Sequence, residues 1–250
     1  MIKRTRKGGA GCSAVLARLT SLANPANVAG MARYGINPTN TLGVSVPLLR
    51  AMAKEIGKDH ALALELWESG IHDARSLAGL IDDPVLVSEE QMERWVRDFD
   101  SWDVCDGVCS NLFDKTPFAY AKAIAWSSRR EEFVKRAGFV LMAALAVHDK
   151  KAPAASFRKF LPIIEREATD ERNFVRKAVN WALRQIGKRS PELNRSAVAS
   201  ARRIRSIDSK AARWIAADAL RELESEAVQD RLKRSRSAHG KDPRKTALSS

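Results

Sequence analysis

Cysteine is scarce in this chain of 250 residues, which contains only Cys12, Cys105 and Cys109. Three unevenly placed thiols cannot build a disulfide framework, so we expect a reducing compartment, the cytoplasm. Long apolar stretches are also missing: the longest, residues 137–147, has 11 residues, against the roughly 20 that cross a bilayer as a helix. The sequence thus argues against a secreted protein stabilised by disulfides and predicts no membrane-spanning segment.

Residues that favour β-strands are few. The chain contains 7 Thr and 2 Tyr but 38 Ala, and alanine has the highest helix propensity of all residues. No alternating pattern of apolar and polar residues of useful length interrupts the helical periodicity. This composition predicts an all-α fold.

Nucleotide-binding and metal-binding motifs are absent as well. The sequence has no glycine-rich phosphate loop, no serine nucleophile elbow and no cysteine–histidine nucleophile pair. Cys105 and Cys109 are four residues apart, but a zinc site needs two further ligands, and no histidine has a suitable spacing. We therefore predict no metal and no cofactor.

Capping signals divide the chain into helices. Ser88 and Gln91 form a capping box ahead of apolar residues at helical spacing, and Asp170 precedes the apolar run from Phe174 to Ile186. A serine or threonine cap followed closely by proline recurs at Ser45–Pro47, Thr116–Pro117 and Ser190–Pro191. The pattern predicts about a dozen helices joined by short loops.

The tryptophans divide into two groups. Trp67, Trp95 and Trp126 each lie among apolar residues at helical spacing, so we predict that they belong to the core. Trp102 comes four residues before Asp106, so on a helix the indole and the carboxylate share one face and can contact the same ligand. The alternative is a core Trp102 with an aspartate of this segment capping the helix start, and the spacing leaves both open.

Two short repeats favour an array of helix pairs. The segment Phe133–Ala137 recurs as Phe174–Ala178, 41 residues later, close to the roughly 40–47 residues of HEAT-type helix pairs. A looser echo relates Lys177–Trp181 to Lys210–Trp214. We therefore expect HEAT-like helix pairs stacked into a curved α-solenoid with a concave face, rather than a four-helix bundle.

The net charge of +13 is unevenly distributed. Residues 1–10 hold four basic and no acidic residues and 231–250 hold seven basic and one acidic, so both are predicted to be disordered basic tails of a single domain, residues 11–230. Inside that domain, residues 11–114 have 8 basic and 15 acidic side chains, whereas 115–230 have 24 and 14. An anionic partner is therefore expected to bind the second half.

Four segments occur in an order that points to a known family. They are Leu42–Arg50 with Ala53–Lys54, Ser101–Asp106, Phe133–Phe139 and Val175–Arg184. In this order they resemble the AlkD-like DNA alkylation repair family, which are DNA glycosylases built from HEAT-like repeats. The resemblance covers about residues 14–230. It implies a basic concave cleft that holds duplex DNA, and hydrolysis of the N-glycosidic bond of N3- or N7-alkylated purines, a step of base excision repair.

The resemblance also assigns roles to single residues. It places catalytic groups at Trp102, Asp106 and Trp181, and a phosphate-binding arginine at Arg136. Further DNA contacts are predicted for the basic side chains of Lys135, Lys177 and Lys210. The chemistry is coherent, because a carboxylate stabilises an oxocarbenium-like sugar and indole faces attract a cationic purine. The fork of an arginine suits a phosphate.

Two other classes of function stay open beside the glycosylase. One is a non-catalytic HEAT-like protein that binds damaged or branched DNA. The other is a protein-interaction scaffold, against which the basic second half argues, because phosphate is the more natural partner of such a surface. For the leading interpretation we expect a monomer that binds alkylated double-stranded DNA and is nucleoid-associated when bound.

Overall fold

The computed structural model describes residues 11–239, with side chains as far as Arg234. All regular secondary structure in this part of the chain is helical, which confirms the all-α prediction. The chain divides into two compact units, residues 1–119 and 120–250. The single domain predicted for residues 11–230 and its concave cleft stay predictions.

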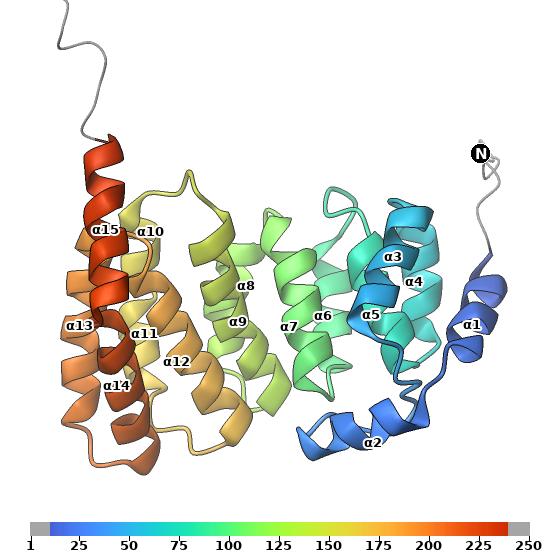
Figure 1. The fold of residues 1–250 in the computed structure, drawn as a ribbon, viewed down its shortest axis with the longest axis horizontal. Helices are drawn as coiled ribbons and strands as arrows, with labels where there is room; N and C mark the ends of the chain where they lie inside the picture. The colour runs from blue at the N-terminus through green and yellow to red at the C-terminus, as the bar shows by residue number, and fades with distance from the viewer. Residues whose placement is uncertain (1–10, 240–250) are drawn as a thin grey trace, which may run out of the picture. The chain divides into compact units, whose positions relative to one another are not determined.

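The first unit is built around α5. In Figure 1, α5 lies among α3, α4 and α7, and it packs against all three. The helices of this unit are α1 (Cys12–Ser21), α2 (Pro25–Arg33), α3 (Val46–Ile56), α4 (His60–Glu68), α5 (His72–Ile81), α6 (Glu89–Arg97) and α7 (Trp102–Asn111), followed by the short 3-10 helix η1 (Phe113–Lys115).

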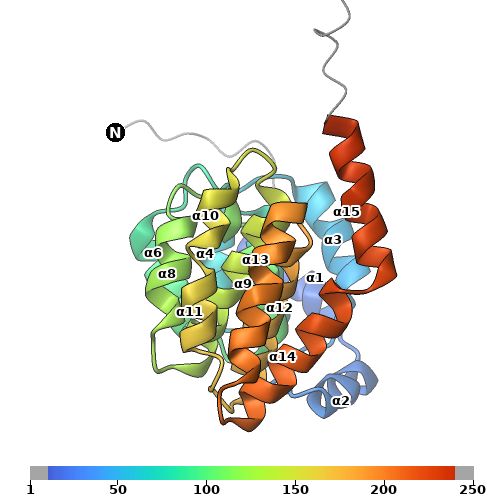
Figure 2. The same cartoon turned by 90° about the vertical axis from the view of Figure 1, so that its left-hand side faces the viewer.

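The second unit is built around α9 and α12. These two helices pack against each other along their lengths, and α12 also contacts α13 and α14 (Figures 1 and 2). The helices of this unit are α8 (Ala119–Ser127), α9 (Glu132–His148), α10 (Ala154–Arg158), α11 (Leu161–Arg166), α12 (Asn173–Gly187), α13 (Pro191–Arg205), α14 (Lys210–Leu223) and α15 (Glu226–His239).

The sequence repeats fall on these packed helices. The first residues of the two matching segments, Phe133 on α9 and Phe174 on α12, contact each other with ring centroids 5.6 Å apart. The looser echo places Trp181 on α12 and Trp214 on α14, and these two helices pack against each other. Equivalent positions of neighbouring repeats therefore meet, as expected of stacked helix pairs.

The predicted core tryptophans are buried. Trp67 and Trp95 are fully buried and stack with parallel rings 3.9 Å apart, while Trp126 is 1% exposed. An apolar cluster of this kind supplies most of the stability of a helical unit, because helices of 9 or 10 residues such as α4 and α7 are marginal alone. The three tryptophan predictions are confirmed.

Two of the predicted caps are confirmed and one is wrong. The hydroxyl of Ser88 accepts the Gln91 N–H at 3.1 Å, and that of Ser190 accepts the Leu193 N–H at 3.2 Å. Thr116, however, ends η1, since its hydroxyl donates to the Phe113 carbonyl at 2.8 Å and α8 begins only at Ala119. The Thr116 hydroxyl therefore belongs to the turn that precedes α8 and does not cap α8 itself.

Two other helix starts differ in detail from the prediction. Asp170 precedes α12 by three residues, and its carboxylate accepts the Arg172 N–H at 3.1 Å and pairs with the Arg172 guanidinium. Ser45 is the N-cap of α3, but its hydroxyl makes no capping hydrogen bond. In both cases the helix begins within a few residues of the expected position, but the predicted side-chain cap is not made.

The predicted C-terminal tail requires a correction. Residues 231–239 are helical, because α15 runs from Glu226 to His239. Val228 and Leu232, one turn apart on this helix, are 9% and 4% exposed, so an apolar stripe holds its first turns against the protein. The sequence prediction gave too much weight to the charge of the segment. Residues 1–10 and 240–250 lie outside the described residues.

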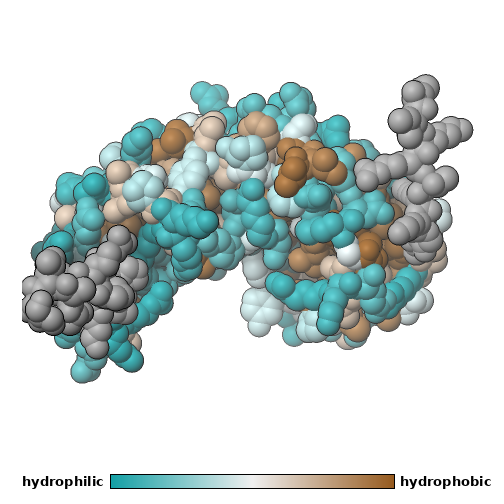
Figure 3. Space-filling model, turned by 90° about the horizontal axis from the view of Figure 1, so that it is seen from above, coloured by the Kyte–Doolittle hydropathy of each residue, from teal (hydrophilic) through white to brown (hydrophobic). Residues whose placement is uncertain are grey.

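The face shown in Figure 3 is mainly hydrophilic, with scattered apolar patches. Large apolar side chains that are exposed include Tyr34, Val46, Leu48, Val85, Leu86, Ile124 and Trp214. Within residues 11–239 no helix has the length and apolar character needed to cross a membrane.

Candidate functional site

Helix α7 carries Trp102 and Asp106 side by side outside its buried core. Its buried residues are Val104, Cys105, Val108 and Cys109. Because successive residues turn by 100° around a helix, Trp102 and Asp106 lie next to each other, Trp102 at the edge of the buried face and Asp106 further from it, and both are half-buried. The Trp102 indole N–H donates to the Tyr34 carbonyl oxygen at 3.1 Å, which fixes the ring. The alternative of a core Trp102 is therefore wrong.

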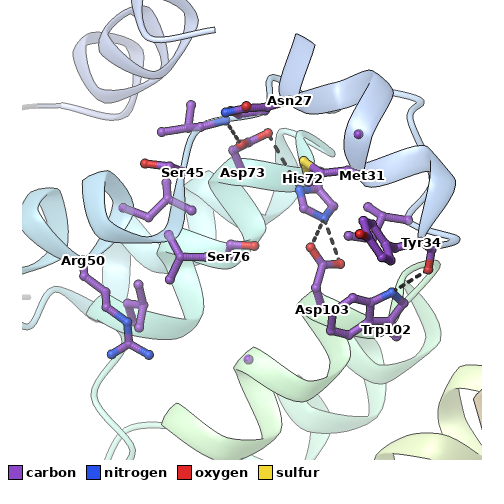
Figure 4. Close-up of a pocket in the computed structure, with 18 of the residues that line it drawn as sticks. Asn27, Met31, Tyr34, Ser45, Arg50, His72, Asp73, Ser76, Trp102 and Asp103 are labelled. Carbon is purple, nitrogen blue, oxygen red and sulfur yellow. Dashed lines mark hydrogen bonds and ion pairs between the residues drawn. The ribbon is translucent and has the colours of Figure 1, made fainter. Parts of the chain in front are cut away.

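A cavity of about 690 Å³ lies beside Trp102, within the first unit (Figure 4). Its walls come from α2, α3, α5 and α7 and from the loop between α2 and α3, and we call it the α2–α7 cavity. Apolar walls are formed by Met31, Tyr34, Ile36, Val44, Leu49, Leu80 and Trp102. Polar groups come from Asn27, Ser45, Arg50, His72, Asp73, Ser76, Asp103 and Asn111.

A histidine between two aspartates forms one end of this cavity. The Nε2 atom of His72 lies 3.0 and 3.1 Å from the two carboxylate oxygens of Asp103, and its Nδ1 atom lies 3.8 Å from Asp73 (Figure 4). Asp73 accepts the backbone N–H groups of Leu42 at 2.6 Å and Val44 at 2.7 Å. Asp73 thereby anchors the α2–α3 loop to the start of α5.

Burial and charge act in opposite directions on the pKa of His72. Burial of the ring, the largest effect, lowers its pKa, but hydrogen bonds and charges from Asp103 and Asp73 outweigh it and raise the pKa to about 9. Burial likewise favours the neutral form of Asp73, but His72 and the Leu42 and Val44 N–H groups lower the pKa of Asp73. Both shifts favour the charged forms at neutral pH, the imidazolium of His72 and the carboxylate of Asp73.

Sequence reasoning missed this cluster. His72 and Asp73 are adjacent at the start of α5, which is a weak signal, but Asp103 is 31 residues beyond His72 and only the fold brings it near. No group of three metal-ligating side chains suited to an ion occurs among residues 11–239.

Two of the predicted DNA-binding residues are engaged within the protein. Arg136 is 6% exposed, and its Nη1 donates to the Phe174 carbonyl oxygen at 2.6 Å, so it ties α9 to α12. The ammonium of Lys135 lies 2.7 Å from Glu167 and 3.2 Å from Asp170. Neither position supports the predicted phosphate contact, because one cation is buried and the other is already neutralised by two carboxylates.

The other predicted residues of the second unit lie at its surface. Lys177 on α12 and Lys210 on α14 are exposed, and neither takes part in an ion pair within the part of the chain that the structure describes. Trp181 is half-buried on the outward face of α12. Because Trp181 and Asp106 belong to different units, their predicted shared site stays a prediction.

A further aromatic side chain accompanies these lysines. Trp214 on α14 is 37% exposed, and the Arg176 guanidinium lies over its ring, 5.1 Å from the centroid. At this distance the π electrons of the indole attract the guanidinium, which keeps its positive charge. We call Arg176, Lys177, Lys210 and Trp214 the α12–α14 surface.

Comparisons with known proteins identify a sequence family and a related fold. The sequence profile of the family described as "DNA alkylation repair enzyme" matches residues 15–223. A solved structure, from "a new family of proteins related to the HEAT-like repeat DNA glycosylases with affinity for branched DNA structures", matches with a TM-score of 0.73 and 21% identity. That match covers 89% of this chain and 96% of the other. It confirms the HEAT-like helical fold. No curated protein sequence matched the chain.

Proposed function

Because the chain belongs to the DNA alkylation repair enzyme family, we propose that it is a DNA glycosylase that removes N3- or N7-alkylated purines from duplex DNA. The observation that carries the proposal is the pairing of Trp102 and Asp106 on α7. An indole and a carboxylate one helical turn apart, neither in the core, can meet one nucleotide of a bound DNA strand.

The chemistry follows from the charge of the substrate. A purine alkylated at N3 or N7 is cationic, so when the C1′–N bond breaks, both bonding electrons leave with the base and the base becomes neutral. The positive charge then develops on the sugar as an oxocarbenium-like species. The Asp106 carboxylate stabilises that charge, and a water molecule adds to C1′ and loses its proton to the carboxylate or to solvent.

DNA binding is proposed for the α12–α14 surface. Lys177 and Lys210 offer ammonium groups free of ion pairs within the described residues, and Arg176 offers a guanidinium spread over Trp214. Each cation that neutralises a phosphate releases counterions, which is the main source of sequence-independent affinity for DNA. Arg136 and Lys135 support the surface indirectly, by holding α9 against α12 and by fixing the loop that precedes α12.

The experiment is incubation of the purified protein with methylated duplex DNA and measurement of released 3-methyladenine and 7-methylguanine. We expect release by the wild type and a loss of at least about 100-fold in Asp106→Asn, because one charge-stabilising group is removed. Asp100→Asn is the matched control, since that carboxylate is exposed and contacts Asn37 through an oxygen that asparagine retains. If the wild-type protein binds DNA but releases no base, the proposed glycosylase activity is wrong.

A second candidate function is the binding of branched DNA. It is favoured by the exposed Trp214 indole, because unpaired bases at a junction can stack on an aromatic face whereas paired bases cannot. The solved relative, described as having affinity for branched DNA structures, supports this candidate.

Trp214→Ala tests the second candidate. If a base stacks on Trp214, this change weakens binding to a four-way junction by about 1–3 kcal/mol and leaves binding to linear duplex nearly unchanged. Ile124→Ala, which removes another exposed apolar side chain of the second unit, is the control in the same titration. Equal losses on junction and duplex would exclude a stacking role.

A further inference from the structure

Helix α2 lies over the α2–α7 cavity without packing on a core. None of its residues is buried, although a helix of nine residues is marginal alone and needs apolar contacts to hold it in place. A cavity of about 690 Å³ takes the place of those contacts. The residues of α2 that line it come from one side of the helix and are Ala26, Asn27, Gly30 and Met31.

A second hollow borders another side of α2. It has a volume of about 410 Å³ and mainly apolar walls, which α2 forms together with the segments before and after it. With space on two sides, α2 can shift or roll without displacing a neighbouring helix. The residues that line this hollow are Ala23, Pro25, Val28, Ala29, Ala32, Pro38, Thr41 and Leu42.

The N-terminal end of α2, by contrast, is closely attached. The Asn24 N–H donates to the Leu42 carbonyl oxygen at 2.8 Å, and the Asn27 side-chain amide donates to the next carbonyl oxygen, that of Gly43, at 2.9 Å. A Cβ at Gly43 would lie 2.5 Å from the Asn24 carbonyl oxygen, so the two backbones touch here. A Cβ at Gly30, in the middle of α2, would meet nothing within 4 Å.

The C-terminal end of α2 is attached through Trp102. The indole N–H of Trp102 donates to the Tyr34 carbonyl oxygen at 3.1 Å, directly after the last residue of the helix. The Tyr34 side chain adds little to this attachment, since it is 75% exposed. Trp102 is therefore both a wall of the cavity and a fixed point for the helix that covers it.

We propose that α2 is a strap that opens and closes the α2–α7 cavity by moving about its two attached ends. The hydrogen bonds of Asn27 and Trp102 limit this movement, one at each end. Opening of the strap breaks the contact between Tyr34 and Trp102, so it frees the indole N–H and changes how the ring is held. The strap does not depend on the proposed function, because its movement requires neither DNA nor catalysis.

The test measures how often the cavity opens to a thiol reagent. Leu49 on α3 lines the cavity and is 5% exposed, so Leu49→Cys in the full chain places a thiol on the cavity wall, with Cys12→Ser to remove the half-buried thiol of α1. Cys105 and Cys109 are fully buried in α7 and report unfolding of the unit. Iodoacetamide labelling followed by peptide mass spectrometry gives all three rates in one sample.

We expect the introduced thiol to react at least about tenfold faster than the two native ones, because local opening requires less free energy than unfolding. Asn27→Ala and Trp102→Phe each remove one attachment of the strap. Each should speed labelling of the introduced thiol about threefold to tenfold, the scale of one hydrogen bond, and leave the two native thiols unchanged.

Asn111→Ala is the matched control for the two detached variants. Asn111 also lines the cavity, but its amide donates to the Gly107 carbonyl oxygen of its own helix at 2.6 Å and does not contact α2. Its loss should therefore leave the labelling rate as in the parent protein.

Ser76→Cys repeats the measurement from α5, another wall of the cavity. Serine and cysteine differ by one atom, so this variant keeps its fold even if Leu49→Cys does not. Equal labelling rates in the parent and in both detached variants, at either introduced thiol, would overturn the strap. A rate that rises only together with those of Cys105 and Cys109 would overturn it too, since the unit would then be unfolding.

Discussion

At the scale of single residues, His72 links stability to pH. Its folded-state pKa of about 9 exceeds the ordinary value of 6.5, so its contribution is complete below pH 6.5 and is lost as the pH rises through 9. The shift corresponds to roughly 3 kcal/mol at most. We therefore expect the free energy of unfolding, from urea titrations, to fall between these pH values in the wild type and to stay nearly flat in His72→Gln.

The matched control for this pH dependence is His148→Gln, which replaces an exposed histidine at the end of α9. That variant should keep the wild-type slope. A wild-type protein whose stability does not change over this range would show that Asp73 and Asp103 do not hold the proton on His72.

Residue identity alone could predict some positions of the candidate site and not others. The four-residue spacing of Trp102 and Asp106 fixes a shared helix face, because helical geometry depends only on sequence separation. The burial of Arg136 could not be predicted, because it depends on the Phe174 carbonyl, 38 residues away. The same holds for His72, whose partner Asp103 is brought close only by the packing of α5 against α7.

At the scale of elements, the close packing of α8 and α9 depends on Gly138. A Cβ built at this position would lie 2.6 Å from the backbone nitrogen of Ser127 and 3.0 Å from the Ala123 carbonyl oxygen, and backbone atoms cannot move aside cheaply. Gly138→Ala should therefore destabilise the protein by about 1–3 kcal/mol despite the better helix propensity of alanine. Thermal unfolding followed by calorimetry measures the difference.

The comparison for Gly138→Ala is Gly30→Ala, at a helical glycine whose Cβ would meet nothing within 4 Å. There the gain in helix propensity is unopposed, so stability should rise by about 0.5–1 kcal/mol. If both variants shifted the free energy of unfolding in the same direction, the close contact between α8 and α9 would not determine the effect of Gly138→Ala.

Helix boundaries were predictable where a cap contacts its own helix. Ser88 and Ser190 accept N–H groups three residues later, a local contact that the sequence contains in full. Thr116 has the same signature but contacts the preceding turn instead. Helix α15 was missed because its anchors, Val228 and Leu232, are too few to outweigh the charge of the segment in a composition argument.

At the scale of the whole molecule, the net charge of the second half is a poor measure of how many cationic side chains DNA can contact. Residues 115–230 have 24 basic side chains, but several are paired internally, among them Arg184 and Lys188 with Glu222, Arg203 with Glu165 and Lys135 with two carboxylates. The total charge predicted an anionic partner. It could not indicate which cations are available, because ion pairing depends on the fold.

Salt dependence of DNA binding distinguishes available cations from paired ones. If Lys177 and Lys210 each neutralise a phosphate, the double variant Lys177→Ala/Lys210→Ala reduces the slope of log K against log salt by about two. Arg202→Ala, which removes an exposed cation already paired with Glu224 at 2.8 Å, should leave the slope nearly unchanged. Fluorescence anisotropy at several salt concentrations gives both slopes. Identical slopes for the wild type and the double variant would show that these lysines do not contact DNA phosphates.

The parallel stack of Trp67 on Trp95 has a spectroscopic consequence. Two indoles whose centroids lie 3.9 Å apart and whose planes differ by 2° couple their transition dipoles, so their near-ultraviolet absorption is shared as an exciton rather than belonging to either ring. Both rings belong to the first unit, whereas Trp126, Trp181 and Trp214 belong to the second. The exciton band is thus an intrinsic reporter for the N-terminal unit, able to follow its melting while the rest of the chain stays folded.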